Sequence, residues 1–310
     1  MSPRGPREGG PRRAIGPVSL HSKDLIEMKN APLGRRRLIA GIAGAGMTAG
    51  LALTGVTVAD TASATLPGVN MEQVVVQAQV EPRRGQTSLA GDSSVRLVQS
   101  ALRAKGYSTA VDGWYGVGTT SAYAAWQRHL GYSGLGANGL PGPTSLAKLG
   151  YNRYTVNHLI KVGPRTTYTG KTVNERTRRM LAAADAKVAF SLVLSQGSYN
   201  PGGEAASAGT HDGGGVVDVS VGKLTTTQRW KAVHALRAVG FAAWLRTPSQ
   251  GDWPYHIHAV AIGDTDMSTV ARDQVADYYA GRNGLASHAL DNTPSSYRAP
   301  FTWWEKYLRS

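Results

Sequence analysis

The stretch "GTHDGGGVVDVS" (residues 209–220) sets a histidine and an aspartate seven positions apart, with three glycines between them and a β-branched run at its end. The run 216–220 predicts a buried strand, and the glycines 213–215 allow the chain to bend sharply before it. His211 and Asp218 are costly to bury unless something binds them. The stretch therefore predicts a strand that carries a polar site.

A second stretch, "DWPYHIHAVAIG" (residues 252–263), predicts another strand with His256 and His258 on one face, because alternate strand residues share a face. If the glycines let the chain bend, His211 and Asp218 converge on these histidines. Two histidines and one carboxylate with an open fourth position are the donor set of a catalytic zinc site. Such a zinc ion acidifies water and polarises a carbonyl.

A plainer alternative needs no metal. In it, His211 and Asp218 form a hydrogen-bonded pair that stabilises a loop, and His256 packs in the core. Either half of the pattern would be weak evidence alone, and the two together favour the metal site.

The rest of residues 151–310 mixes helices and strands. "KTVNERTRRMLAAADAKV" predicts a helix with Thr172 and Glu175 as its capping box, and "TTTQRWKAVHALRAVG" predicts a helix that ends at Gly240. "AFSLVLSQGSY" predicts a strand that leads into a loop. Because regular βαβ repetition is lacking, the predicted fold class of this domain is α+β. The aromatic tail, with Trp303, Trp304 and Tyr307, is interpreted as a segment packed over the domain.

Residues 92–150 have a different pattern, which predicts a small all-α domain of three helices. Apolar residues recur at helical spacing, and a turn of similar sequence occurs twice, at Asp112–Gly116 and Asn138–Gly142. About 60 residues suffice for such a bundle but leave little room for a catalytic site.

This segment resembles the peptidoglycan-binding domain 1 family in four motifs, "VRLVQSALRAKGY", "VDGWYGVGT", "AYAAWQ" and "GLPGPTSLAKL". The resemblance implies non-covalent attachment to cell-wall glycopeptide, with Trp114, Tyr115 and Trp126 as contacts. The alternative is that these aromatic residues fill the bundle core, which is favoured for Trp126 because it lies on the apolar stripe.

Residues 1–64 have the three-part layout of a signal peptide: a polar basic run, an apolar stretch and the small-residue site Ala62–Ala64. Arg35 and Arg36 resemble a twin-arginine signal, which implies export of a folded protein. The alternative is a membrane anchor, but the stretch is rich in Gly and Ala and only weakly apolar. Residues 65–91 are interpreted as a linker, in which one short helix is compatible with the sequence.

The composition limits the partners. Without residues 1–64 the chain would keep 25 Lys and Arg against 16 Asp and Glu, a net charge of +9, which favours anionic surfaces. The basic residues are scattered and no nucleic-acid-binding signature occurs, so we expect anionic cell wall as the partner, no nucleic acid, and no membrane once the signal is cleaved. Cysteine is absent, so no disulfide framework is expected. The oligomeric state stays open.

The domain 151–310 resembles the M15 metallopeptidases, zinc D-alanyl-D-alanine peptidases of cell walls, over roughly residues 165–285. The family pairs His-x6-Asp with a later histidine. The resemblance implies that zinc is bound by His211, Asp218 and His258, and that His256 is an accessory group for the oxyanion or substrate.

The loop "SQGSYN" lies where relatives hold the substrate's terminal carboxylate. There the resemblance implies hydrogen bonds from Gln196, Ser198 and Tyr199. The arginine often found in that loop is missing, so carboxypeptidase and endopeptidase action both stay open.

One position departs from the family pattern. The family places Glu or Asp three residues before the last ligand, where it takes a proton from zinc-bound water, and this chain has Tyr255 there. Tyrosine, with a pKa near 10, is a poor general base at neutral pH. Asp252 is the nearby upstream carboxylate, and a bend at Pro254 could bring it towards the metal.

Three functional hypotheses remain at this stage. The chain is a secreted zinc peptidase that cuts peptidoglycan stem peptides, a zinc-stabilised wall-binding protein made catalytically weak by Tyr255, or a structural wall protein without metal. We expect the first of these, with Asp252, Tyr255 and His256 as the catalytic candidates.

Overall fold

The computed structural model describes residues 65–84 and 91–310, so the predicted signal peptide lies outside the described residues. The α-helices are α1 (Met71–Arg84), α2 (Ser93–Ala104), α3 (Val117–His129), α4 (Pro143–Leu149), α5 (Glu175–Asp185), α6 (Thr226–Ala238), α7 (Thr269–Tyr279) and α8 (Trp304–Tyr307). The strands are β1 (Gly68–Asn70), β2 (Thr155–Asn157), β3 (Arg165–Tyr168), β4 (Lys171–Asn174), β5 (Leu194–Gln196), β6 (Val216–Ser220), β7 (Phe241–Arg246) and β8 (His256–Ala261). Across these two ranges, no helix combines the length and the apolar character needed to cross a bilayer.

The predicted three-helix segment is confirmed as α2, α3 and α4, and its repeated turn has one physical basis. A buried glutamine of the preceding helix clamps each turn: Gln99 accepts the N–H of Gly113 at 2.9 Å, and Gln127 accepts the N–H of Gly139 at 2.8 Å. Each amide group then donates to the same turn, to the carbonyl of Trp114 or of Leu140. The two turns are therefore equivalent units of one small fold.

Residues 71–84, inside the segment interpreted as a linker, form the 14-residue helix α1. The sequence shows no amphipathic pattern there because almost the whole helix is buried rather than one face of it. Its Gln79 is buried and bridges two backbone groups, donating to the carbonyl of Asp264 at 3.0 Å and accepting the N–H of Gly263 at 2.9 Å. The segment is therefore part of the folded structure.

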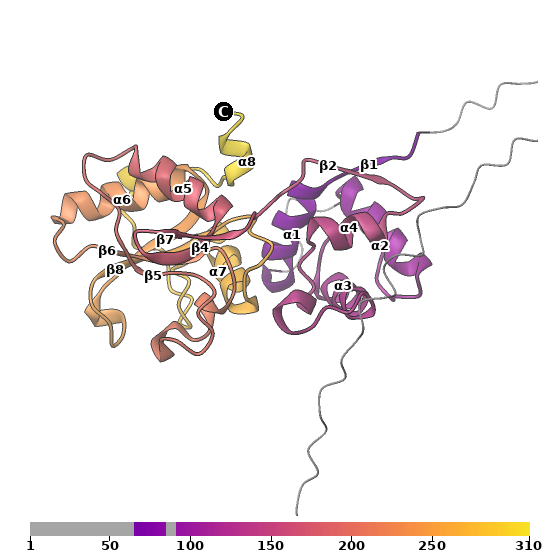
Figure 1. Ribbon diagram of the computed structural model, residues 1–310, viewed down its shortest axis with the longest axis horizontal. Coiled ribbons are helices and arrows are strands. Elements are labelled where there is room, and N and C mark those ends of the chain that lie inside the picture. Colours follow the sequence, from indigo (N-terminus) through magenta and orange to yellow (C-terminus); the bar gives the residue numbers. More distant parts are fainter. Residues whose placement is uncertain (1–64, 85–90) are drawn as a thin grey trace, which may run out of the picture. The chain divides into compact units, whose positions relative to one another are not determined.

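The larger part of the chain is built on a four-stranded antiparallel sheet in the order β5-β6-β8-β7, which agrees with the predicted α+β class. One face of this sheet is apolar and packs against α5 and α6 (Figure 1). The residues on it are alternate strand residues: Val217, Val219, Ala243, Leu245, Ile257, Ala259 and Ala261.

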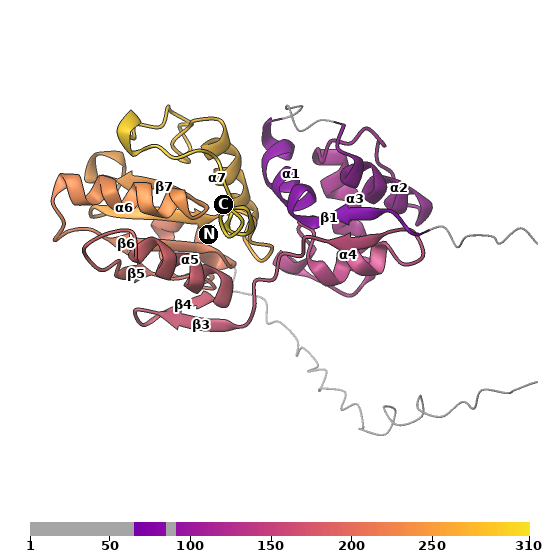
Figure 2. The same cartoon turned by 90° about the horizontal axis from the view of Figure 1, so that it is seen from above.

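The opposite face carries the polar side chains. Antiparallel pairing aligns Asp218 of β6 with His258 of β8, and His258 with Trp244 of β7. Two residues along, Ser220, His256 and Arg246 form the next row. Helix α7 packs against β7 and β8, and Figure 2 shows its position beside the sheet. The same strands thus supply a core face and a functional face.

Two predictions about this part are resolved by the structure. The capping box of Thr172 and Glu175 is wrong: Thr172 lies in β4, and Asn174 caps α5 by accepting the N–H of Thr177 at 2.8 Å. The aromatic tail packs over the domain as predicted, because Trp304 is buried in the cluster under α5 and α6.

We expect a side chain at Gly240, the residue at which helix α6 was predicted to end, to lower the stability of the protein. The φ of Gly240 is +107°, and a Cβ atom would lie 2.7 Å from the backbone N of Trp304. We therefore expect Gly240→Ala to lower the free energy of unfolding by about 1–3 kcal/mol, measured by urea denaturation. Gly222→Ala is the matched control, since nothing lies within 4 Å of its Cβ position. Equal urea midpoints for the two variants would contradict the prediction.

Candidate metal centre

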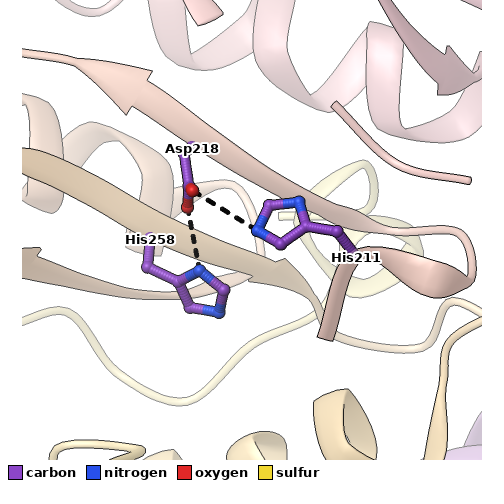
Figure 3. A group of neighbouring side chains, drawn as sticks. All are labelled: His211, Asp218 and His258. Atoms are coloured by element: carbon purple, nitrogen blue, oxygen red, sulfur yellow. Dashed lines mark hydrogen bonds and ion pairs between the residues drawn. The ribbon is translucent and has the colours of Figure 1, made fainter. Parts of the chain in front are cut away.

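Three of the predicted site residues, His211, Asp218 and His258, come together at the sheet. His211 lies in the short turn Thr210–Asp212, and the other two face each other across β6 and β8. Their ligand atoms all lie within 4.8 Å of one another. Figure 3 shows the two imidazoles turned towards the carboxylate between them: His258 Nδ1 is 2.9 Å from Asp218 Oδ1, and His211 Nε2 is 3.4 Å from Asp218 Oδ2.

The glycines between His211 and Asp218 make this approach possible. Gly215 has a φ of +78°, and a Cβ atom there would lie 2.7 Å from Asp264 Cβ. At Gly213 a Cβ atom would lie 2.3 Å from the backbone oxygen of Asp266. The predicted bend is therefore confirmed, and it depends on backbone packed too closely for any side chain.

In each imidazole, the outer nitrogen, which points away from Asp218, already has a hydrogen-bond partner. His211 Nδ1 lies 2.8 Å from the carbonyl oxygen of Gly197, which can only accept, so Nδ1 carries the proton. His258 Nε2 lies 2.8 Å from Gln274 Oε1. That amide is oriented by its own Nε2, which donates to the carbonyl of Gly284 at 3.0 Å. In neutral His211 the unprotonated nitrogen therefore points at Asp218, and in neutral His258 it does so when the ring proton is on Nε2, bonded to Gln274.

The surroundings of Asp218 and His258 keep both groups in the protonation states that bind a metal. Burial lowers the pKa of His258, although the hydrogen bond and charge of Asp218 oppose that effect. Burial alone would raise the pKa of Asp218, but the two imidazoles beside it hold that pKa well below its usual range. At neutral pH the group is thus a carboxylate beside a neutral imidazole at position 258.

Three electron-pair donors converge in this buried place, an arrangement that suits a cation. His211 Nε2 is buried and has no hydrogen-bond partner of its own in the part of the chain that the structure describes. Two imidazole nitrogens and one carboxylate are also a donor set suited to zinc. The triad could therefore hold one divalent metal ion.

The triad opens into a cavity of about 960 Å³. Gln196 lines it from β5 and exchanges hydrogen bonds with the side chain of Ser207. His256 lines it from β8: its Nδ1 is 2.8 Å from the carbonyl oxygen of Pro254 and its Nε2 is 4.0 Å from Asp218 Oδ1. Both residues thus lie beside the triad.

Asp252 and Tyr255 also line this cavity but differ in their contacts. The ring of Tyr255 packs against the guanidinium of Arg229, whose Cζ is 4.4 Å from the ring centroid. Asp252 is exposed to the cavity and makes no hydrogen bond or ion pair with the residues that the structure describes. Of the two, Asp252 is the one that brings a carboxylate to the cavity.

Two residues predicted to bind substrate are not brought to the cavity. Ser198 is buried, and its hydroxyl donates to the carbonyl of Val216 at 2.7 Å and accepts the N–H of the same residue at 3.1 Å. The hydroxyl of Tyr199 donates to Asp266 at 2.8 Å. Both hydroxyls hold loops together, and neither side chain lines the cavity.

The aromatic residues of the helical segment also take different places. Tyr115 is fully buried and its hydroxyl donates to the carbonyl of Gly139 at 3.0 Å, so it belongs to the core rather than to a binding surface. Trp126 is a core residue as well, with its Nε1 bonded to the carbonyl of Ser145. Trp114 is only partly buried and lines a small groove of about 310 Å³ with Asp112.

Polar cavity residues that were not predicted from the sequence include Glu204, Arg246 and Gln274. For Arg246 a signal exists, because "FAAWLR" reads as an apolar strand, and successive strand residues place Arg246 on the face opposite Leu245. For Gln274 none exists, since its role depends on how α7 packs against β8.

Comparison with known proteins supports the helical segment. Residues 91–149 match the family described as "Putative peptidoglycan binding domain", close to the predicted boundaries of 92–150. Comparison with curated proteins and with solved structures gave no match. The chain therefore contains a peptidoglycan-binding domain, which indicates association with the cell wall.

The hydrogen bonds of the imidazole nitrogens that point away from Asp218 predict which nitrogen of each ring carries the proton. In protein to which Zn²⁺ has been added, we expect His211 to be the Nδ1–H tautomer and His258 the Nε2–H tautomer, measured by nitrogen NMR of labelled histidine. Gln274→Met removes the acceptor of His258 only, so it should shift the signals of that ring and leave those of His211 in place. A proton on Nδ1 of His258 would contradict this assignment.

Proposed function

We propose that the chain is an exported zinc-dependent peptidase that acts on peptidoglycan stem peptides. The observation that carries the proposal is the convergence of His211 Nε2, His258 Nδ1 and both carboxylate oxygens of Asp218 at the wall of a large cavity. The peptidoglycan-binding domain at residues 91–149 supports the choice of substrate, because it would keep the cavity close to the polymer. Export through a twin-arginine signal in residues 1–64 is part of the proposal.

The residues present fit zinc better than the metal-free alternative. In a hydrogen-bonded pair without metal, His211 Nε2 would carry a proton towards Asp218, yet its ring proton is committed to Gly197. When bound, zinc supplies an acidified water and a polarised carbonyl group. Gln274 and Gly197 would orient the two histidine ligands from outside, as partners of metal-binding histidines generally do.

The chain's own residues supply the proton chemistry. Asp252 is the proposed general base, because it is a carboxylate in the cavity with no competing partner among the described residues. Tyr255 is held by Arg229 and is assigned no proton transfer. The Nδ1 proton of neutral His256 is committed to Pro254, so its Nε2 donates a hydrogen bond to substrate only when the ring is protonated.

The second candidate function is a zinc-stabilised wall-binding protein with little turnover. It is favoured by Tyr255, which stands where the M15 family, in the resemblance above, places its base. The two functions share the metal site and the wall-binding domain, and they differ in whether Asp252 takes the role of the base.

Metal content tests the site. We expect the full chain to bind about one zinc ion, and His211→Ala, Asp218→Ala and His258→Ala each to lower the affinity by more than the roughly 10–100-fold that loss of an outer hydrogen-bond partner costs. Elemental analysis after dialysis measures this. His256→Ala is the matched control and should keep its zinc. Equal zinc content in all five proteins would exclude the site.

Peptidase assays separate the two candidate functions. We expect the zinc-loaded chain to release D-alanine or a cleaved fragment from a stem peptide that ends in two D-alanines, and Asp252→Asn to slow this release about 10²–10⁴-fold while zinc stays bound. Glu204→Gln removes another cavity carboxylate and should have little effect. Tyr255→Glu should also help little. An inactive wild type that Tyr255→Glu activates would favour the wall-binding function instead.

A further inference from the structure

Arg246 is the last residue of β7 and belongs to the functional face of the sheet. It pairs with His256 of β8 and lies one residue after Leu245, whose side chain packs on the opposite, apolar face. The side chain of Arg246 is 3% exposed, yet it lines the cavity that contains the metal triad. A cationic group is thus buried in the wall of the candidate site.

The guanidinium group is held in place but not fully used. Nη1 donates to the carbonyl of Asn283 at 2.7 Å, and Cζ lies 5.1 Å from the ring centroid of Trp244. Nη2 is buried and has no hydrogen-bond partner among the described residues. Burial lowers the pKa of Arg246 to about 10, against the influence of Asp218 and Asp291, so the group remains charged at neutral pH.

The other arginine of the cavity is different. Arg83 lies 3.4 Å from Asp273 and 3.7 Å from Asp277, so its charge is balanced within the chain. Arg246 has no carboxylate within 4 Å in the described part of the chain, and Asp218, the nearby acid, is committed to the two imidazoles. Of the lysines and arginines that line the cavity within that part, Arg246 is the one without an ion pair.

An unpaired guanidinium group binds ligands that are negatively charged and can accept its hydrogen bonds. A buried N–H of a charged group is costly without an acceptor, and the planar fork of arginine matches a carboxylate. The fixed bond to Asn283 and the contact with Trp244 hold the fork in one orientation before any ligand arrives. A guanidinium group held in one orientation binds most tightly the anion whose geometry matches that orientation.

The position of Arg246 limits where that carboxylate lies in a peptide. The row of Arg246 and His256 is two residues along the strand from the row of Asp218 and His258, a step of about 7 Å. An extended peptide covers this distance in about two residues. The carboxylate therefore belongs within about two residues of the bond that lies at the triad.

We propose that Arg246 is the anion-binding residue of this cavity and selects peptides with a carboxylate within about two residues of the reacting bond. This inference rests on the proposed peptidase function. Two sources share the chemistry: the C-terminal carboxylate of the peptide and the side-chain carboxylate of a neighbouring residue. The first would make the chain a carboxypeptidase, and the second would allow it to cut within a chain.

Binding to non-hydrolysable peptides tests this without requiring turnover. The probes end in two D-alanines joined by a CH₂–NH link, and they carry a free C-terminal carboxylate, a C-terminal amide, or that amide with a glutamate just before the two D-alanines. Calorimetry on the zinc-loaded full chain should show that one carboxylate peptide binds about 10–100-fold more tightly than the plain amide. Whichever carboxylate gives this preference identifies the source.

Three variants assign the preference to the guanidinium. Arg246→Met should reduce the ratio between the acid and the amide to about two or less, and Arg246→Lys should keep part of it. Arg83→Met is the matched control, an arginine of the same cavity whose charge is already paired, and should keep the full ratio.

Two results would overturn the proposal. One is a wild type that binds all three probes equally, a comparison that needs no variant to fold. The other is an Arg246→Met chain with normal zinc content that loses the same affinity for acid and amide, as a purely structural role requires. Failure of the proposed function would appear separately, as wild-type protein that hydrolyses no peptide yet still prefers a carboxylate probe.

Discussion

A buried carboxylate between two imidazoles is the constraint on which the site depends. Asp218 is only 9% exposed, and each neighbouring ring has its outer nitrogen bonded to a fixed acceptor, at Gly197 and at Gln274. With the ring protons on these outer nitrogens, the inner nitrogens of the neutral rings have no proton to offer. Groups of this kind repel one another unless a cation joins them, so in the proposed metal site the surrounding hydrogen bonds, as well as the triad, would prepare the ligands.

The two faces of the sheet have different roles, because successive residues of each strand point to opposite faces. Odd-numbered residues of β6, β7 and β8, such as Val217 and Ile257, form the apolar core under α5 and α6, while even-numbered residues carry the site. Residues 282–284 then fix three members of the functional face through their carbonyl groups, which accept from Trp244, Arg246 and Gln274. One backbone segment thus orients the outer partner of a histidine and the unpaired guanidinium together, so a change in this loop would affect both.

The two folded parts of the chain solve different physical problems. The helical segment at residues 91–149 is a peptidoglycan-binding domain with a rigid, twice-repeated turn and only a small groove. The sheet supports a cavity of about 960 Å³ that combines paired acids, four histidines and a free arginine. In the proposed function, attachment to the insoluble polymer raises the local concentration of substrate at the cavity. This division of roles fits a protein associated with the cell wall.

The sequence by itself determined the features that depend on local spacing. The three-helix segment, the strands with Asp218 and His258, the bend at the glycines and the packing of the aromatic tail follow from periodicity, turn residues and apolar content. Tertiary structure alone decided which polar groups are free. Ser198, Tyr199 and Tyr115 have the right chemistry for binding, but their hydroxyls are bonded to Val216, Asp266 and Gly139. Helix α1 was predicted only as one short helix compatible with a linker, since its polar residues are buried along with its apolar ones and form no exposed stripe. Gln274 and Arg246 gain their roles from α7 and from residues 282–284, which lie far away in the chain, and hydrogen bonds of such long range leave no periodic trace in a sequence.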